Sequence, residues 1–347
     1  MPAKNRLMRL AAIAAFSAML LPAAAGEPRV LVYTDHEPLG GMRTQFIHDV
    51  LLPAIERESN GRLKIDAHWG GEVASGQDAL RVLGEGRGAD MGIVVPEYVS
   101  GNLPLHQLFK SFPSGPSGDR QLAFFRRVAA EIPAFSAELD HANVSTVFFA
   151  TGYPMAFFSA KPLRALDDFS GGKWRSASFW HQDFLRNAGA VPVSIPWGPG
   201  VLAALHAREL DGVMVNVDSA AVLKVQDAAP NVLIAKELWM GHAYLLVMNK
   251  ASWNGLTRED RQAIERAGES AYKVLGGVMD SGFDAMLDTL RKDGATVRVL
   301  SPGEVARWRT ATRYREVQAD WVKTVAVKGT RDAGPVLEKL RAILAEP

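Results

Sequence analysis

Short apolar runs alternate with helical stripes along the first two-thirds of the chain. The runs are bounded by polar turns, as expected for strands of a buried sheet. Strands are predicted at residues 29–33, 63–67, 91–95, 144–150, 191–195, 213–217, 244–248 and 296–300. Helical patterns between them include 42–59, 77–83 and 119–139. This alternation predicts an α/β chain with mainly parallel sheets.

The pattern changes at Thr257, where a long helix is predicted. Thr257 is followed three positions later by Asp260, which fits a capping box with Asp in place of the usual Glu or Gln. An apolar stripe continues to Gly294 and predicts one helix of roughly 35 residues, about 50 Å long and able to cross two domains. Gly276-Gly277 is a place where it can bend. Residues 303–327 predict a further packed helix.

The first 25 residues have the pattern of a secretory signal peptide. Lys4, Arg6 and Arg9 precede an apolar run over residues 10–21, and Pro22-Ala23-Ala24-Ala25 provides the small residues of a cleavage site. The run is shorter than the roughly 20 apolar residues of a membrane span. We therefore expect cleavage after Ala25 and a periplasmic location, with no lipid attachment because the chain has no cysteine.

Charge and composition exclude several classes of protein. The chain has 39 basic and 38 acidic residues, and loss of residues 1–25 would leave 36 and 38, because that segment has three basic residues and no acidic one. A near-neutral chain lacks the basic surplus of a nucleic-acid binder. The absence of cysteine excludes disulfides, thiolate metal sites and cysteine nucleophiles. A length of about 320 residues after cleavage predicts two domains.

Motifs for common cofactors and catalytic groups are missing or lie in the wrong context. Gly84-Glu85-Gly86-Arg87-Gly88 ends a predicted helix and precedes a strand, the reverse of a dinucleotide-binding loop, so it predicts a turn. The sequence has no Gly-Xaa-Ser-Xaa-Gly or His-Glu-Xaa-Xaa-His motif, and its histidines lack metal-ligand spacing. We expect no metal, no cofactor and no enzymatic activity; a periplasmic enzyme is the rival from another class.

Polar residues at the ends of predicted strands are candidate ligand contacts. Asp35-His36-Glu37 follows strand 29–33, at the edge where open α/β sheets bind ligands. A hydrogen-bonding loop is favoured there over a metal site, with solvated surface as the alternative. Arg175 lies in a short strand beside aromatic residues, where a carboxylate could accept two hydrogen bonds from its guanidinium. A structural salt bridge or a solvated strand end is the alternative for Arg175.

Residues at two further strand ends are candidates to line a ligand-binding cleft. Trp197 lies between Pro196 and Gly198 in a loop that leads into a helix. Asn216, Asp218 and Ser219 follow the next strand, and their side chains can contact a ligand or cap a helix, capping being the commoner role. Most of the nearby aromatic residues are expected in the core.

Four ordered segments resemble the extracytoplasmic solute-binding subunits of tripartite ATP-independent periplasmic (TRAP) transporters, the DctP-like family. The resemblance covers essentially the whole length after the leader. The segments are LLPAIERESNGRLKIDAHWGGEVASGQDALRVLGEGRGADMGIV, SAKPLRALDDFSGGKWRSAS, GAVPVSIPWGPGVLAALHARELDGV and HAYLLVMNKASWNGLTREDRQAI. The second contains the Lys-Xaa-Arg strand that is typical of the family.

The resemblance implies the two-lobed periplasmic solute-binding fold, with a long helix crossing both lobes. Lobe I is expected at 26–151 with a return segment at about 241–275, and lobe II at 152–240 with a C-terminal segment at about 276–347. The family's carboxylate-binding Arg matches Arg175, its ligand-packing aromatic residue matches Trp197, and its polar contact matches Asn216. From the other lobe we expect contacts by His36, Gln77 and Tyr98.

Two departures from the family pattern affect the expected ligand. Gly152-Tyr153-Pro154 stands where many members have a second Arg, and Pro199-Gly200 where a Glu is common. Substitutes for the missing Arg are expected among Tyr153, Trp180, His181 and Gln182, which would favour a larger, aromatic or less charged ligand. The implied partners are a small organic acid and two TRAP membrane subunits, a small four-helix subunit and a large permease. Delivery to a different transporter or to a sensor is the alternative.

Overall fold

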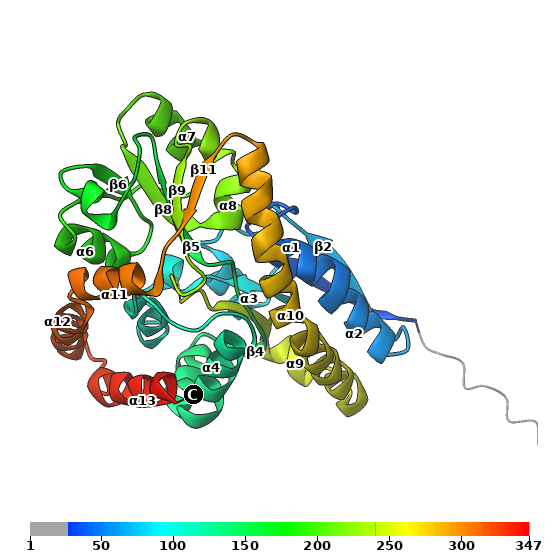
Figure 1. Ribbon diagram of the computed structural model, residues 1–347. Helices are drawn as coiled ribbons and strands as arrows, with labels where there is room; N and C mark the ends of the chain where they lie inside the picture. Colours follow the sequence, from blue (N-terminus) through cyan, green and yellow to red (C-terminus); the bar gives the residue numbers. More distant parts are fainter. Residues whose placement is uncertain (1–26, 240, 347) are drawn as a thin grey trace, which may run out of the picture.

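The computed structural model describes residues 27–239 and 241–346. The predicted signal peptide lies outside these residues. Two sheets organise the described chain, as Figure 1 shows. The first has the strand order β2-β1-β3-β10-β4 and the second β11-β9-β5-β8-β6-β7. The expected α/β fold with two lobes is confirmed.

The strands lie close to the predicted segments. The first sheet consists of β1 (Arg29–Thr34), β2 (Leu63–His68), β3 (Met91–Val94), β4 (Val144–Ala150) and β10 (Tyr244–Asn249). The second consists of β5 (Met155–Ser159), β6 (Lys173–Arg175), β7 (Val191–Val193), β8 (Gly212–Asn216), β9 (Asn231–Ile234) and β11 (Thr296–Val299). The uniformly buried β5 and the short β9 are strands that the sequence pattern does not predict.

The sheets are mixed, and the prediction of mainly parallel sheets is wrong at two central strands. β10 is antiparallel to β3 and β4, and β5 is antiparallel to β8 and β9. Each of these strands is reached when the chain crosses from the other sheet, so it enters from the opposite end. All residues of β5 and β10 are buried. Both antiparallel strands are therefore part of the cores.

Helices cover both sheets. The predicted helix 42–59 consists of α1 (Met42–Phe46), a π-helical turn η1 (Ile47–Leu51) and α2 (Leu52–Glu58). The predicted helix 119–139 is two helices, because Pro133 lacks a backbone N–H and begins a new one. The other helices are α3 (Ala79–Glu85), α4 (Gly118–Glu131), α5 (Pro133–His141), α6 (Phe179–Asn187), α7 (Pro199–His206), α8 (Val217–Val222), α9 (Lys250–Asn254), α10 (Arg258–Lys292), α11 (Pro302–Ala311), α12 (Tyr314–Val327) and α13 (Ala333–Ala345).

Helix α10 is the predicted long helix, and its 35 residues span both lobes. The hydroxyl of Thr257 accepts from the backbone N–H of Asp260 at 3.1 Å and begins the helix as expected. Along its length α10 packs against α2, α4 and β4 of the first lobe and against α8 and β11 of the second, as can be followed in Figure 1. No helix in the described part of the chain has the length and hydropathy needed to cross a membrane.

The C-terminal helices return from the second lobe to the first. A left-handed residue, Arg313 (φ 47°), separates α11 from α12, so the predicted helix 303–327 is two helices. Trp308 of α11 packs on Phe157 of the second lobe, with ring centroids 5.0 Å apart. Helix α12 lies against α6, and α13 against α4. The chain thus ends on the first lobe, where Figure 1 marks its C-terminus beside α4.

Adjacent glycines of α10 are expected to respond oppositely to alanine. A Cβ at Gly276 would lie 1.7 Å from Oδ1 and 2.7 Å from the backbone nitrogen of Asp119 on α4, whereas one at Gly277 would meet nothing within 4 Å. We expect Gly276→Ala to lower the free energy of unfolding by about 1–3 kcal/mol through overpacking. Gly277→Ala should raise it by about 0.5–1 kcal/mol through helix propensity. Urea unfolding of both variants tests the pair, and equal effects would contradict the close α4–α10 contact.

Candidate functional site

A cleft between the two sheets is lined by side chains from both lobes. The first lobe contributes the loop after β1, the 3₁₀ segments η2 (Pro96–Val99) and η3 (Leu105–Ser111), and the start of β10. The second lobe contributes the end of β6, the loop into α6, Trp197 and the end of β8. The cavity has a volume of about 30 Å³. That is room for one or two water molecules, so the lobes must separate before a solute can enter.

Arg175 is the buried cation on the second-lobe side of the cleft. It is 2% exposed, its Nε donates to the Ile195 carbonyl at 2.8 Å, and its guanidinium lies 5.1 Å from the centroid of the Trp197 ring. Its Nη2 is buried and has no hydrogen-bond partner among the described residues. Burial lowers the pKa of Arg175 to about 10, which keeps the group positive at neutral pH. A charged side chain with an unpartnered donor among the described residues thus lines the cleft.

A buried ion pair faces it from the first lobe. Lys110 Nζ contacts Glu97 Oε1 and lies 3.2 Å from the ring nitrogens of His242. The side chains of Lys110 and Glu97 are 6% and 8% exposed. Burial lowers the pKa of Lys110, and the charge of Glu97 opposes that shift. The second oxygen of Glu97, Oε2, is buried without a partner among the described residues.

The loop after β1 is held by a second buried pair. Asp35 accepts from Arg43 Nη1 at 2.5 Å and Nη2 at 3.1 Å, and also from the Tyr33 hydroxyl at 2.8 Å. Arg43 Nη2 also donates to Glu37 at 2.9 Å. Burial opposes ionisation of Asp35, but Arg43 lowers the pKa of that carboxyl below its usual value. The charge of Arg43 is therefore compensated by Asp35 and Glu37 within the loop.

Three histidines line the cleft as neutral rings. His36 lies edge-on to Tyr98, with ring centroids 5.6 Å apart. Burial lowers the pKa of His36, with Glu37 opposing the shift. Burial, together with the nearby charge of Lys110, also lowers the pKa of His181 and of His242 well below the usual value. None of the three adds positive charge at neutral pH.

Asn216 closes the second-lobe wall beside a buried acid. Its Nδ2 donates to Asp218 Oδ1 at 2.7 Å and to the Ser219 hydroxyl at 2.8 Å, so the amide nitrogen is occupied at the start of α8. Burial raises the pKa of Asp218 to about 6, and the negative charge of Glu37 adds to the increase. Asn216 itself is 5% exposed and lines the cleft.

The raised pKa of Asp218 gives a pH-dependent prediction. In the folded protein this carboxyl binds its proton up to about pH 6, against an ordinary value of 3.8. Its contribution to stability is therefore greatest below pH 3.8 and falls as the pH rises through 6. We expect Asp218→Asn to raise the free energy of unfolding at pH 7.5 by about 1–3 kcal/mol and to add almost nothing at pH 4. Urea midpoints at both values test this, and a gain equal at the two would contradict it.

The structure brings six of the ten predicted contact residues to the cleft. Arg175, Trp197, Asn216 and His181 line its second-lobe side, and His36 and Tyr98 line the other; their ligand roles stay predictions.

The other four predicted residues lie outside this lining. Gln77 is exposed, and Gln182 donates to the Ser176 carbonyl at 3.0 Å. Trp180 is fully buried and packs against Trp321, with ring centroids 5.2 Å apart. The Tyr153 hydroxyl lies against α10, only 1.8 Å from where a Cβ of Gly282 would be.

Sequence reasoning missed four first-lobe residues of the cleft, of which Glu97 and Lys110 form an ion pair. Glu97, Lys110, His242 and Tyr244 all line it. One signal for them existed, since Lys110 is a single charge inside the apolar run Leu108-Phe109-Lys110-Ser111-Phe112. A lysine in such a run has to be paired where it is buried.

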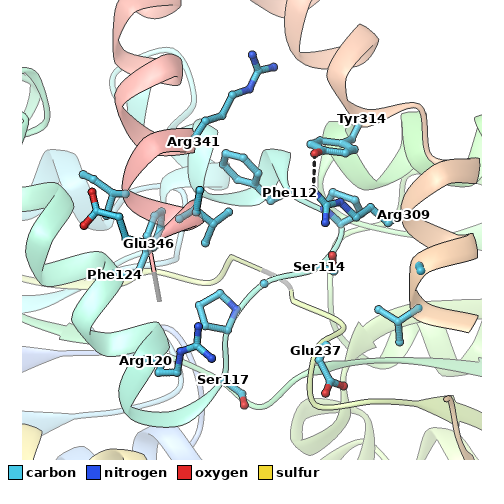
Figure 2. Close-up of a pocket in the computed structure, with 18 of the residues that line it drawn as sticks. Phe112, Ser114, Ser117, Arg120, Phe124, Glu237, Arg309, Tyr314, Arg341 and Glu346 are labelled. Carbon is cyan, nitrogen blue, oxygen red and sulfur yellow. Dashed lines mark hydrogen bonds between the residues drawn. The ribbon is translucent and has the colours of Figure 1, made fainter. Parts of the chain in front are cut away.

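A larger cavity of about 710 Å³ lies between α4 and the C-terminal helices, and Figure 2 shows its walls. Most of the arginines that line it already have hydrogen-bond or ion-pair partners. Arg127 pairs with Glu131 and Glu346, and Arg309 donates to the Tyr314 hydroxyl at 3.0 Å. Arg120, Glu237 and Glu346 at its rim are exposed. This open crevice does not combine buried, unpartnered donors and acceptors as the cleft between the sheets does.

Comparison with known proteins agrees with this architecture. Residues 47–319 match the model of the bacterial extracellular solute-binding protein family 7. A solute-binding protein of Albidiferax ferrireducens is 23% identical over 285 residues, which cover 79% of this chain and 80% of that protein. A TRAP solute-binding protein of Rhodoferax ferrireducens, solved with copurified benzoate, superimposes with a TM-score of 0.78 at 20% identity, over 91% of this chain and 98% of that one.

A third protein has the same fold. DctP7, a Bordetella pertussis extracytoplasmic solute receptor that binds pyroglutamic acid, superimposes with a TM-score of 0.72 at 20% identity, over 90% of this chain and 99% of that one. The family match covers most of the chain, and the two-lobed fold with its intervening cleft agrees with it. The protein therefore belongs to family 7 of the bacterial extracellular solute-binding proteins, the family of TRAP-transporter receptors.

Proposed function

We propose that the protein captures a small organic acid outside the cytoplasm and that Arg175 binds its carboxylate. The observation on which this rests is the buried guanidinium of Arg175, with Nη2 unpaired among the described residues. A carboxylate supplies the planar pair of acceptors that a guanidinium fork fits best. The ring of Trp197 beside the guanidinium gives the solute an apolar face to pack on.

Supporting evidence comes from the ligands of the similar receptors. Benzoate and pyroglutamic acid each have one carboxylate, and both were bound by proteins of the same fold. A carboxylate solute for this chain is therefore consistent with both its geometry and its family.

Binding would be coupled to movement of the lobes. The cleft-lining groups come from both sheets, so only a closed form contacts a solute from two sides. In this proposal residues 26–151 with about 241–275 move relative to 152–240 with about 276–347, except that α13 stays packed on α4. The closed form would dock on a small four-helix subunit and a large permease, the membrane subunits of a TRAP transporter.

A thermal-shift screen of the exported protein tests the proposal. A solute at 100 times its dissociation constant should stabilise the folded state by about 2.7 kcal/mol, a measurable rise in melting temperature. Organic acids are expected to give the hits. If no acid raised the melting temperature while a sugar or a polyamine did, the assignment would be overturned.

A further inference from the structure

On the first-lobe side of the cleft, one carboxylate oxygen of Glu97 has no hydrogen-bond donor among the described residues. Lys110 occupies Glu97 Oε1, whereas Oε2 is buried and unpartnered among the described residues. A buried acceptor left without a donor is costly, so native proteins rarely keep one without a use. Glu97 and Arg175 line the same cleft from opposite lobes, so one solute that enters when the lobes separate can contact both.

The charges of the cleft also limit the solute. Arg175 offers a cation whose Nη2 is free among the described residues, whereas Lys110 is paired with Glu97 and Arg43 with Asp35 and Glu37. A second carboxylate on the solute would meet the carboxylates of Glu97 and Glu37 without a free cation to offset them. Buried like charges repel strongly. A dianion therefore fits this cleft poorly.

We propose that the solute is a monocarboxylate that also has a hydrogen-bond donor, an N–H or O–H group, and that Glu97 Oε2 accepts from this donor. This rests on the proposed function, because it takes the carboxylate to be held by Arg175. The two contacts lie on opposite lobes, so a solute that makes both also links the lobes in the closed form. Glu97 is then a specificity-determining residue.

Matched pairs of acids test this on the unmodified protein. Pyroglutamate has a ring N–H where 5-oxotetrahydrofuran-2-carboxylate has a ring oxygen, and 3-hydroxybenzoate has a hydroxyl that benzoate lacks. In titration calorimetry we expect the donor-bearing member of at least one pair to bind about tenfold tighter or better, since a buried charged acceptor rejects a partner without a donor. Succinate is expected to bind more weakly than that member.

A variant assigns the preference to Glu97. Glu97→Gln keeps the shape of the side chain and removes its charge, so the preference within the pair should shrink severalfold. Glu138→Gln is the matched control, because Glu138 is a carboxylate of the same lobe, 11% exposed, that accepts from the backbone N–H of Leu105 outside the cleft. The control should keep the full preference. Circular dichroism checks that each variant is folded, and the wild-type pairs decide the case without any variant.

The outcomes separate this inference from the proposed function. Equal binding within both pairs, or tightest binding of succinate, would overturn the donor requirement while leaving a carboxylate receptor in place. A preference that Glu97→Gln leaves intact would overturn the role of Glu97. Failure of every acid to bind would overturn both.

Discussion

Replacing Arg175 with alanine is expected to weaken binding of a carboxylate solute by about 100-fold or more. The guanidinium is 2% exposed, so a carboxylate bonded to it is removed from water together with it. Truncating one partner of such a buried, hydrogen-bonded charge pair costs about 2–5 kcal/mol, and each 1.4 kcal/mol is a factor of ten in affinity. Titration calorimetry with the best acid from the screen measures the loss.

Two further variants make that result specific. Arg175→Lys keeps the charge but loses the fork, so we expect it to recover only a small part of the affinity. Arg120→Ala removes an exposed arginine at the separate crevice of Figure 2 and should leave binding unchanged. Retained affinity in Arg175→Ala, within a factor of about two, would show that the carboxylate is bound elsewhere.

Replacing Asp35 with alanine is expected to lower the free energy of unfolding by about 3–5 kcal/mol. Asp35 and Arg43 are 1% and 3% exposed, and removal of the acid leaves a buried guanidinium whose one acidic partner among the described residues is Glu37. Breaking a buried ion pair from one side costs this much because the remaining charge loses its compensation. Urea unfolding monitored by circular dichroism measures the change.

The control for Asp35→Ala is a substitution in a solvent-exposed ion pair of the same protein. Asp78 and Arg81 form a bridge at 3.1 Å with both side chains more than half exposed. Asp78→Ala should leave the urea midpoint almost unchanged, because exposed pairs contribute little. The double variant Asp35→Leu/Arg43→Met should recover much of the lost stability, since an apolar pair needs no compensation. An Asp35→Ala protein as stable as Asp78→Ala would contradict the buried pair.

Local patterns in the sequence predict most of the elements. The 35-residue helix follows from its cap at Thr257 and its apolar stripe, both of which are local. The direction of β5 and β10 does not follow, because it depends on crossings between sheets that no local period records. Pro133 marks the division of α4 from α5, and a stricter treatment of that proline would have predicted it.

The second-lobe side of the cleft was more predictable than the first-lobe side, where the sequence indicated His36 and Tyr98 but not Glu97 or Lys110. Arg175, Trp197 and Asn216 follow strands that end at one edge of the second sheet, so strand order places them together. Glu97 and Lys110 lie on two 3₁₀ segments, and they meet His242 of the irregular segment before β10, more than 130 positions later. Irregular segments have no period from which such a meeting could be predicted. Trp180 and Tyr153 were expected as substitutes for the Arg missing from the family pattern, but Trp180 packs against Trp321 and the Tyr153 hydroxyl lies against α10.

The unpaired atoms of the cleft have a consequence for unloaded receptors. If the lobes close with no solute, Arg175 Nη2 and Glu97 Oε2 are both buried without a described partner. Each such atom costs about 1–3 kcal/mol, so the two together disfavour closure by roughly 30-fold or more. A solute that bonds both removes this penalty. If Arg175 and Glu97 bind the solute as proposed, they would also keep an empty receptor open, so that the membrane subunits of the transporter would rarely meet a closed receptor with nothing to deliver.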